Sequence, residues 1–254
     1  MFKNNICGII NMMFMGLMFS LGLCLGSCAT CLLHRLHFDE AGFIKGRSHC
    51  PACKTKLSWR ELIPVLSYIY QKGHCRHCDA KISAFYPITE LVFALVFLLF
   101  ASAEIWLLLI VFCLLLLFFQ DVRYMEVDRR IAWPAIFIAL IWCCFQENPE
   151  NFLLGGMVGF SFYALQYFVS HKKWVGQGDL DLGLLMGLLL GWPQILLGLF
   201  LAYILGLVYT LPLLILKKLS LKSAVPMGAF LIPATLIMLR WGSEIQSWYY
   251  SQLF

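Results

Sequence analysis

The chain has 254 residues, of which 61% are hydrophobic and only 13% charged, and its mean hydropathy is +0.80. About a quarter of the residues of a soluble domain are charged, so this composition excludes a soluble protein, a disordered tail and a DNA-binding domain as descriptions of the whole chain. The apolar residues occur in long runs separated by short polar segments, which is typical of a protein that crosses a membrane several times.

The net charge of +5 does not indicate a nucleic-acid partner, because the basic residues cluster at the ends of the apolar runs. Nine of the 19 Lys and Arg residues fall between Arg35 and Lys81, and all others except Lys3 and Arg240 form three short groups. Basic residues gather in this way on the cytoplasmic side of membrane proteins. We therefore expect the lipid bilayer, and no nucleic acid, as a partner.

In chain order, the apolar runs predict an all-α fold: a polytopic membrane helix bundle with about eight transmembrane helices. The predicted spans are residues 8–33, 85–102, 105–120, 131–146, 152–169, 180–191, 194–216 and 226–243. The sixth span is shorter than the roughly 20 residues of a full crossing. With the N-terminus outside the cytoplasm, all inside loops carry Lys or Arg and the outside connections carry none. This topology places both termini in the periplasm.

The first predicted span has an alternative interpretation as a cleavable export signal. Lys3 precedes an apolar run, and residues 25–28 resemble a lipoprotein cleavage box. Cleavage there would export the most basic loop of the chain, against the usual charge distribution. We therefore expect residues 1–33 to be a transmembrane helix.

Residues 34–84 are the only sizeable polar segment, and we predict that they form a small cytoplasmic domain. Two C-x-x-C pairs stand in it, Cys50 with Cys53 and Cys75 with Cys78. This spacing is close to that of zinc ribbons, and four thiolates would complete a closed, structural Zn²⁺ site. The alternative is a redox loop in which each pair cycles through a disulfide, but a reducing cytoplasm favours a metal site.

Two carboxylates at the membrane edge are candidates for catalysis. Asp121 follows an apolar run at the inner end of the third span, and Asp179 follows Gly176-Gln177-Gly178 at the inner start of the sixth. Both should lie at the same depth, where one could act as general base on a water and the other as general acid. The alternative is that they are loop charges or helix caps, and spacing alone does not decide between these.

Two further features concern packing. Glu90 lies near the start of the second span, and we expect it to face the protein, since a carboxylate facing lipid is costly. The G-x-x-x-G spacing of Gly155 and Gly159 predicts a close helix contact.

Taken together, these motifs resemble those of the bacterial type 4 prepilin peptidases, which belong to the G-x-G-D intramembrane aspartic proteases. The resemblance covers most of the chain. Its motifs are Gly26-Ser27, Arg35-Leu36, residues 48–53, 62–68 and 73–78, Tyr86-Pro87, Glu90-Leu91, Asp121, residues 176–179, Pro226 and Gly228.

The resemblance implies that the protein removes the leader peptide of type IV prepilins and pseudopilins after a glycine, at the cytoplasmic face of the bacterial inner membrane. It implies Asp121 and Asp179 as catalytic residues of a peptidase domain spanning 85–254, with no metal in the cleavage chemistry. It further implies that residues 34–84 form a methyltransferase region, which methylates the new N-terminal residue with S-adenosylmethionine. The substrates serve pili or a secretion system.

The sequence departs from the family pattern near the proposed dyad. Asp181 stands where the family usually has Lys, Asp128-Arg129 replaces a common Pro-Asp pair, and Thr30 replaces an Asn. Asp181 is two residues from Asp179 and therefore on a different helix face. Asp128 is the reserve candidate for the catalytic position of Asp121.

Two other classes of function are alternatives. A membrane thiol oxidoreductase would use the C-x-x-C pairs and leave both aspartates without a role. A transporter or non-catalytic membrane assembly factor would keep its function after each Asp was changed to Asn.

Overall fold

The computed structural model describes residues 2–38, 48–220 and 223–253, and throughout this part the regular elements are helices, as the sequence predicts. The chain divides into two compact units, residues 1–103 and 104–254. Among the described residues, four helices are long and apolar enough to cross a membrane. They are Asn11–His37, Ile105–Tyr124, Pro149–Val169 and Gln194–Ile215.

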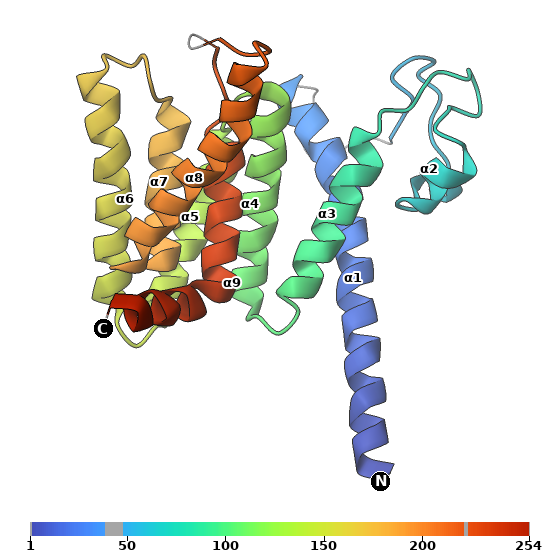
Figure 1. Cartoon of the computed structure of the whole chain (residues 1–254). Coiled ribbons are helices and arrows are strands. Elements are labelled where there is room, and N and C mark those ends of the chain that lie inside the picture. Colours follow the sequence, from blue (N-terminus) through green and yellow to red (C-terminus); the bar gives the residue numbers. More distant parts are fainter. Residues whose placement is uncertain (1, 39–47, 221–222, 254) are drawn as a thin grey trace. The chain divides into compact units, whose positions relative to one another are not determined.

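The first unit contains two long helices and the polar loop. Helix α1 (Phe2–His37) packs against α3 (Phe85–Leu99), and the loop adds the short helices η1 (Trp59–Leu62) and α2 (Leu66–Tyr70) (Figure 1). The backbones of α1 and α3 approach closely at Gly22, which has no side chain. A Cβ atom at this position would lie only 2.6 Å from the Cα atom of Ala94. Small residues permit this approach between helices in membranes. Residues 39–47 of the predicted loop domain lie outside the described residues.

The second unit contains α4 (Ile105–Tyr124), α5 (Arg129–Cys144), α6 (Pro149–Val169), α7 (Gln177–Leu190), α8 (Gln194–Ile215) and α9 (Gly228–Leu253). The short helix α7 packs against α5, α6, α8 and α9, and nine of its 14 residues are buried. A helix that is apolar all round belongs in the interior of a bundle. The sixth predicted span, which was too short for a full crossing, therefore corresponds to α7, a helix buried within this unit.

The predicted small-residue contact between helices is confirmed at the α6–α7 interface. A Cβ atom on Gly155 would lie 2.5 Å from the backbone oxygen of Gly187, and one on Gly159 would collide with the backbone of Gly183. Glycine is required at both positions, because any side chain would force the two backbones apart.

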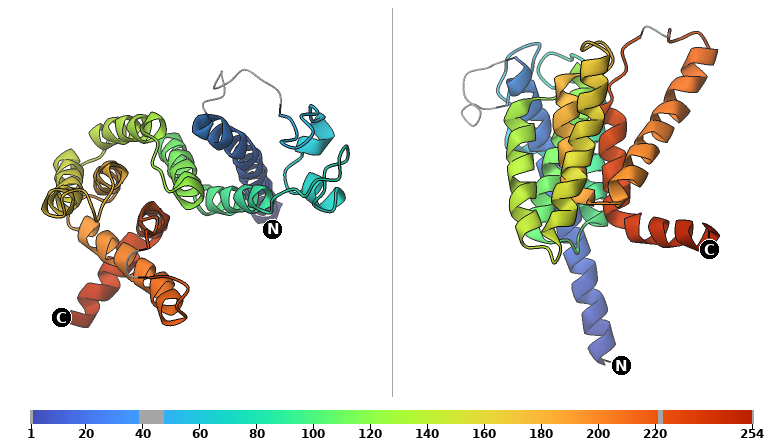
Figure 2. Two further views of the ribbon diagram at one scale, coloured as in Figure 1. Left: turned by 90° about the horizontal axis from the view of Figure 1, so that it is seen from above. Right: turned by 90° about the vertical axis from the view of Figure 1, so that its left-hand side faces the viewer.

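The helix ends have local causes that the sequence carries. The Asp128 side chain accepts a hydrogen bond from the backbone N–H of Arg130 and so caps α5. Helix α7 ends at Leu190, and the following residue, Gly191, has a φ of +70° in the left-handed region. Helix α9 continues past the predicted span and turns near its C-terminal end (Figure 2), where Gln194 donates a 3.0 Å hydrogen bond to Gln246.

Candidate active site and metal centre

Asp121 lies in the last turn of α4 and is only 5% exposed. Its Oδ2 atom accepts a 2.9 Å hydrogen bond from the backbone N–H of Ala229, in the first turn of α9. The N-terminus of a helix presents free N–H groups and partial positive charge, which bind a carboxylate. A Cβ atom on Gly228 would lie 2.8 Å from the same oxygen, so the absent side chain lets α9 approach Asp121.

Asp179 lies in the first turn of α7, where its Oδ2 atom accepts a 2.9 Å hydrogen bond from the backbone N–H of Gly176. The backbone N–H of Asp179 in turn donates a 3.2 Å hydrogen bond to the carbonyl oxygen of Gly176, and the Asp179 carboxylate satisfies an otherwise free N–H at the helix start. Gly178 packs against Val127 of the α4–α5 connection, and a Cβ atom there would collide with the valine side chain. The glycines thus bring the start of α7 against the segment that follows Asp121.

The structure brings Asp121 and Asp179 to the same end of their unit. Leu182 stands one turn after Asp179 on the same face of α7, and its Cδ1 atom lies 2.9 Å from the Cβ position of Gly228, beside the Asp121 carboxylate. The face of α7 that carries Asp179 therefore turns toward Asp121, while their catalytic roles remain predictions.

The other two aspartates near the dyad have ion-pair partners. Asp128 Oδ2 lies 2.8 Å from an Arg130 guanidinium nitrogen, in addition to capping α5. Asp181 is buried, and its Oδ2 atom lies 3.3 Å from Nε of Arg129. Two of the residues that depart from the family pattern, Arg129 and Asp181, therefore form an ion pair with each other.

Sequence reasoning did not identify the groups that hold the dyad. The Ala229 N–H, Leu182 and Val127 carry no motif of their own, because their role depends on contacts between distant segments. The glycine at position 228, shortly after Pro226 and just before an apolar run, was the one available signal. Its function is steric, and the sequence alone does not reveal the carboxylate that occupies the space.

The four cysteine thiols of the loop converge on one point. Their Sγ atoms all lie within 4.8 Å of one another, and those of Cys50 and Cys78 are 3.9 Å apart. A tetrahedral zinc site with Zn–S bonds of about 2.3 Å has S–S edges of about 3.8 Å. The thiols therefore have the spacing of a metal-binding cluster, and this cluster could hold a metal ion.

The two C-x-x-C segments have the same local structure. Cys50 and Cys75 each accept a 2.9 Å hydrogen bond at the backbone oxygen from the residue four positions later, Lys54 or Asp79. Both of those residues have positive φ, and an isolated β-bridge flanks each turn, His49 with Lys56 and His74 with Lys81. These two short hairpins aim both thiol pairs at one centre.

Hydrogen bonds lower the pKa of two of the four thiols, Cys53 and Cys75. The side-chain hydrogen bond to Thr55, 3.2 Å long, lowers the pKa of the Cys53 thiol to about 6. Backbone N–H groups of His77 and Cys78 lower the pKa of Cys75. The hydrogen bond from the Ala80 backbone lowers the pKa of Cys78, but burial and the neighbouring thiols of Cys53, Cys75 and Cys50 outweigh it and raise that pKa to about 12. Because cysteine binds metal as the thiolate, the contacts of Cys53 and Cys75 favour a bound cation.

The loop is attached to α3 through Glu90, which is only 7% exposed. The Glu90 Oε2 atom accepts a 2.7 Å hydrogen bond from the backbone N–H of Val65, a residue with φ of +59°. A β-branched residue rarely adopts this conformation, so the bond to a buried carboxylate helps to hold it. The expectation that Glu90 faces the protein is confirmed.

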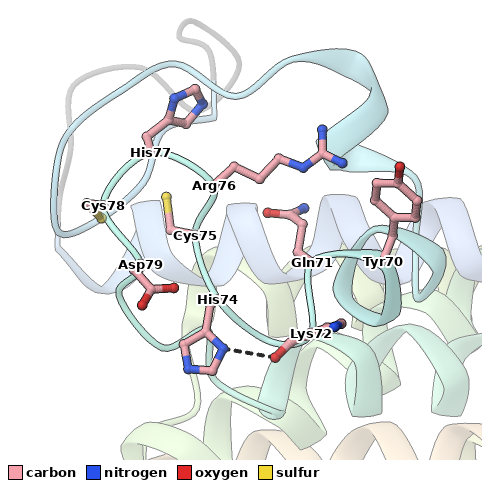
Figure 3. Close-up of a pocket in the computed structure, with 9 residues that line it drawn as sticks. All are labelled: Tyr70, Gln71, Lys72, His74, Cys75, Arg76, His77, Cys78 and Asp79. Carbon is pink, nitrogen blue, oxygen red and sulfur yellow. Dashed lines mark hydrogen bonds between the residues drawn. The ribbon is translucent and has the colours of Figure 1, made fainter.

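A pocket of about 400 Å³ lies beside the second C-x-x-C segment (Figure 3). Polar and charged side chains predominate in its lining, among them Lys72, Arg76 and Asp79. The His74 ring nitrogen Nδ1 is 2.9 Å from the backbone oxygen of Lys72, which fixes one side of the recess. Its volume falls within the range of small-molecule pockets.

Comparison with known proteins identifies relatives of both units. Residues 20–103 match the model of the bacterial Peptidase A24 N-terminal domain, and residues 107–211 match that of the type IV leader peptidase family. A prepilin leader peptidase/N-methyltransferase of Aeromonas salmonicida (strain A449) is 30% identical over 219 residues, which are 82% of this chain and 75% of the relative.

The protein of the same name from Bacillus subtilis (strain 168) is 29% identical over 251 residues, 92% of this chain and 97% of the relative. The one from Vibrio cholerae is 34% identical over 191 residues, 66% and 74% of the two chains. No solved structure matches the chain significantly. Together with the matched positions of both family models, the extent of these similarities shows that the chain belongs to the type IV leader peptidase family.

Proposed function

We propose that the chain is a prepilin leader peptidase and N-methyltransferase: an intramembrane aspartic endopeptidase that removes the leader of type IV prepilins and pseudopilins after a glycine, then methylates the new N-terminus. Its relatives carry both activities in their names. The observation that supports the peptidase half is that the Asp121 carboxylate lies at the first turn of α9, beside the face of α7 that carries Asp179.

In the proposed reaction, one ionised carboxylate takes a proton from a water that attacks the scissile carbonyl. The other carboxyl, which is protonated, gives its proton to the leaving amine as the C–N bond breaks. The Ala229 N–H holds Asp121, and the Gly176 N–H holds Asp179. Both carboxylates are thus positioned by backbone groups, leaving their second oxygens for the water and the substrate.

The methyltransferase half is proposed for residues 34–84, within a chain divided functionally into 1–33, 34–84 and 85–254. S-adenosylmethionine would supply the methyl group to the free amine, and the pocket beside the second C-x-x-C segment has room for a ligand of that class. We propose Zn²⁺ as the ion of the four-cysteine cluster. Four thiolates leave no position for a water on the metal, so its role would be structural.

The proposed topology follows from the distribution of charge. The loop 34–84 and the other basic connections lie in the cytoplasm, and the eight predicted spans cross the bacterial inner membrane with both termini in the periplasm. The terminal residues 1 and 254 lie outside the described residues. Prepilin substrates would reach the dyad from the cytoplasmic face, where α4 ends and α7 begins.

The test compares membranes carrying wild type, Asp121→Asn and Asp179→Asn, with Asp128→Asn as the matched control. Cleavage of a model prepilin is read as a mobility shift, and methylation of an already mature substrate as transfer of a radiolabelled methyl group. We expect each dyad variant to insert, to methylate and not to cleave, whereas Asp128→Asn cleaves. Normal cleavage by either dyad variant would refute the assignment and favour a non-catalytic assembly factor.

A membrane thiol oxidoreductase is the second candidate, and the convergence of all four thiols on one point does not favour it. It predicts thiols that titrate with redox potential and no bound zinc. Stoichiometric zinc in the purified protein would count against it.

A further inference from the structure

The short helices of the polar loop expose apolar side chains and bury none. No residue of η1 or α2 is buried, although most of their residues are apolar. Five large side chains, here called the loop patch, are between 40% and 77% exposed: Trp59, Leu62, Leu66, Ile69 and Tyr70. A soluble domain of this size would normally turn such residues inward.

The loop patch has the geometry of a single surface. Trp59 and Leu62 are three apart in a 3₁₀ helix and so lie on one side of η1. Leu66, Ile69 and Tyr70 are three and four apart in α2 and share one face of it, and η1 packs against α2. On the opposite side, the ring of Tyr68 lies against Gly73. The apolar stripe is therefore turned outward while the remaining face of α2 is in contact with the loop.

Basic side chains border this surface. The guanidinium carbon of Arg60 lies 5.3 Å from the centroid of the Trp59 ring, and that of Arg76 lies 4.8 Å from the centroid of Tyr70. The acidic neighbour Glu61 turns inward, since its side chain is 6% exposed and its Oε1 atom lies 3.4 Å from His77 Nε2. The rim of the loop patch is thus positively charged. Its aromatic residues, Trp and Tyr, are the types that are enriched where proteins meet the membrane–water interface.

The hydrogen bond between Val65 and Glu90 fixes the depth of the loop patch. Glu90 is five residues into α3, about 7.5 Å along the helix from its loop-side end at a rise of 1.5 Å per residue. Val65 directly precedes α2, so α2 lies beside the first turns of an apolar helix rather than beyond its end (Figure 1). This is the level at which such a helix enters the bilayer.

From these observations we propose that the loop patch docks onto the surface of the membrane. Its apolar side chains enter the headgroup region, and Arg60 and Arg76 bind anionic phospholipid headgroups. Partial burial of apolar side chains, combined with attraction of arginines to anionic lipids, is how interfacial helices bind a bilayer. Docking would hold the four-cysteine loop against the membrane, where a substrate N-terminus emerges. The proposal concerns the lipid surface alone and does not depend on the proposed enzymatic activity.

The test uses the full chain in nanodiscs of phosphatidylethanolamine and phosphatidylglycerol, with acyl chains either plain or brominated close to the headgroup. The fluorescence emission of Trp59 is obtained by subtracting the emission of the Trp59→Phe variant of each protein from the emission of that protein. We expect bromination to cause a loss of Trp59 emission in the wild type. The double variant Leu66→Ser/Ile69→Ser should lose this quenching, whereas Leu57→Ser, a like change on the first C-x-x-C segment, should keep it.

Trp59 emission that is equal in plain and brominated discs would overturn the proposal, since the loop patch would then face water or be covered by protein. Quenching that persists in the double variant would also overturn it, because the loop patch would not be what holds Trp59 in the lipid. Equal quenching in phosphatidylcholine discs would overturn the role of the two arginines. Prepilin cleavage, measured in the same discs, reports on the proposed function separately, because its loss with quenching intact leaves the docking proposal standing.

Discussion

Replacing Gly228 by Ala tests whether the start of α9 positions the proposed catalytic carboxylate. The new Cβ atom would lie 2.8 Å from Asp121 Oδ2 and 2.9 Å from Leu182 Cδ1. Ordinary contacts between such atoms are about 3.5 Å or longer, so the neighbours must separate by roughly 0.5–1 Å. That movement stretches the 2.9 Å hydrogen bond from Ala229 to Asp121.

The size of the effect follows from that hydrogen bond. A hydrogen bond to a charged group contributes about 1.5–3 kcal/mol, and each 1.36 kcal/mol corresponds to a tenfold change in rate, so we expect kcat for prepilin cleavage to fall about 10- to 100-fold. A displacement of about 1 Å in an active site has a similar cost. Methylation of an already mature substrate should be unchanged, because the four-cysteine loop belongs to the other unit of the chain.

The assay is a time course of prepilin cleavage at saturating substrate, with methyl transfer measured on the same preparation. Gly206→Ala is the matched control, because its Cβ atom would meet only Phe230 at an ordinary distance of 3.5 Å. It should cleave like the wild type. A Gly228→Ala protein that folds, methylates and cleaves with the wild-type kcat would refute the idea that α9 holds Asp121.

Three further variants test other parts of the structure. Asp181→Asn breaks an ion pair whose arginine is half exposed, and the loss of this pair lowers the free energy of unfolding by at most about 1 kcal/mol. A prepilin assay should therefore show cleavage within a few-fold of the wild-type rate. Complete loss of cleavage would move the catalytic assignment to Asp181. Cys75→Ser should abolish bound zinc, measured by metal analysis, and open the loop to proteolysis, whereas Cys144→Ser on α5 should change neither; zinc retained by Cys75→Ser would exclude the four-cysteine site. Gly159→Ala should lower the free energy of unfolding by about 1–3 kcal/mol, and with it the unfolding temperature, because the new methyl group overpacks against α7. Gly16→Ala should leave both unchanged, because there is open space around Gly16. Equal unfolding temperatures of the two variants would contradict the close α6–α7 contact.

Local features of the sequence were sufficient to predict the apolar helices of this protein, but not the short helices η1 and α2 of the polar loop. Each long apolar run predicted one helix, because a membrane-spanning backbone must satisfy its hydrogen bonds within the segment. The spacing of the C-x-x-C pairs predicted a cluster of four thiols, because each short turn brings its own two sulfurs together. Asp121 and Asp179 stood out because acidic residues are few and these two directly adjoin apolar runs.

Contacts between distant segments were decided only in the tertiary structure. Ala229 binds a carboxylate 108 residues earlier in the chain, and Val65 binds one 25 residues later. Apolar periodicity shows which face of a helix is buried but does not name the helix that covers it, so neither contact had a signal in the sequence. The outward-facing apolar side chains of α2 were equally hidden, because five residues are too few to show an amphipathic period. The sequence by itself therefore determined the helices and the types of chemical group, whereas the packing of the helices determined which groups meet.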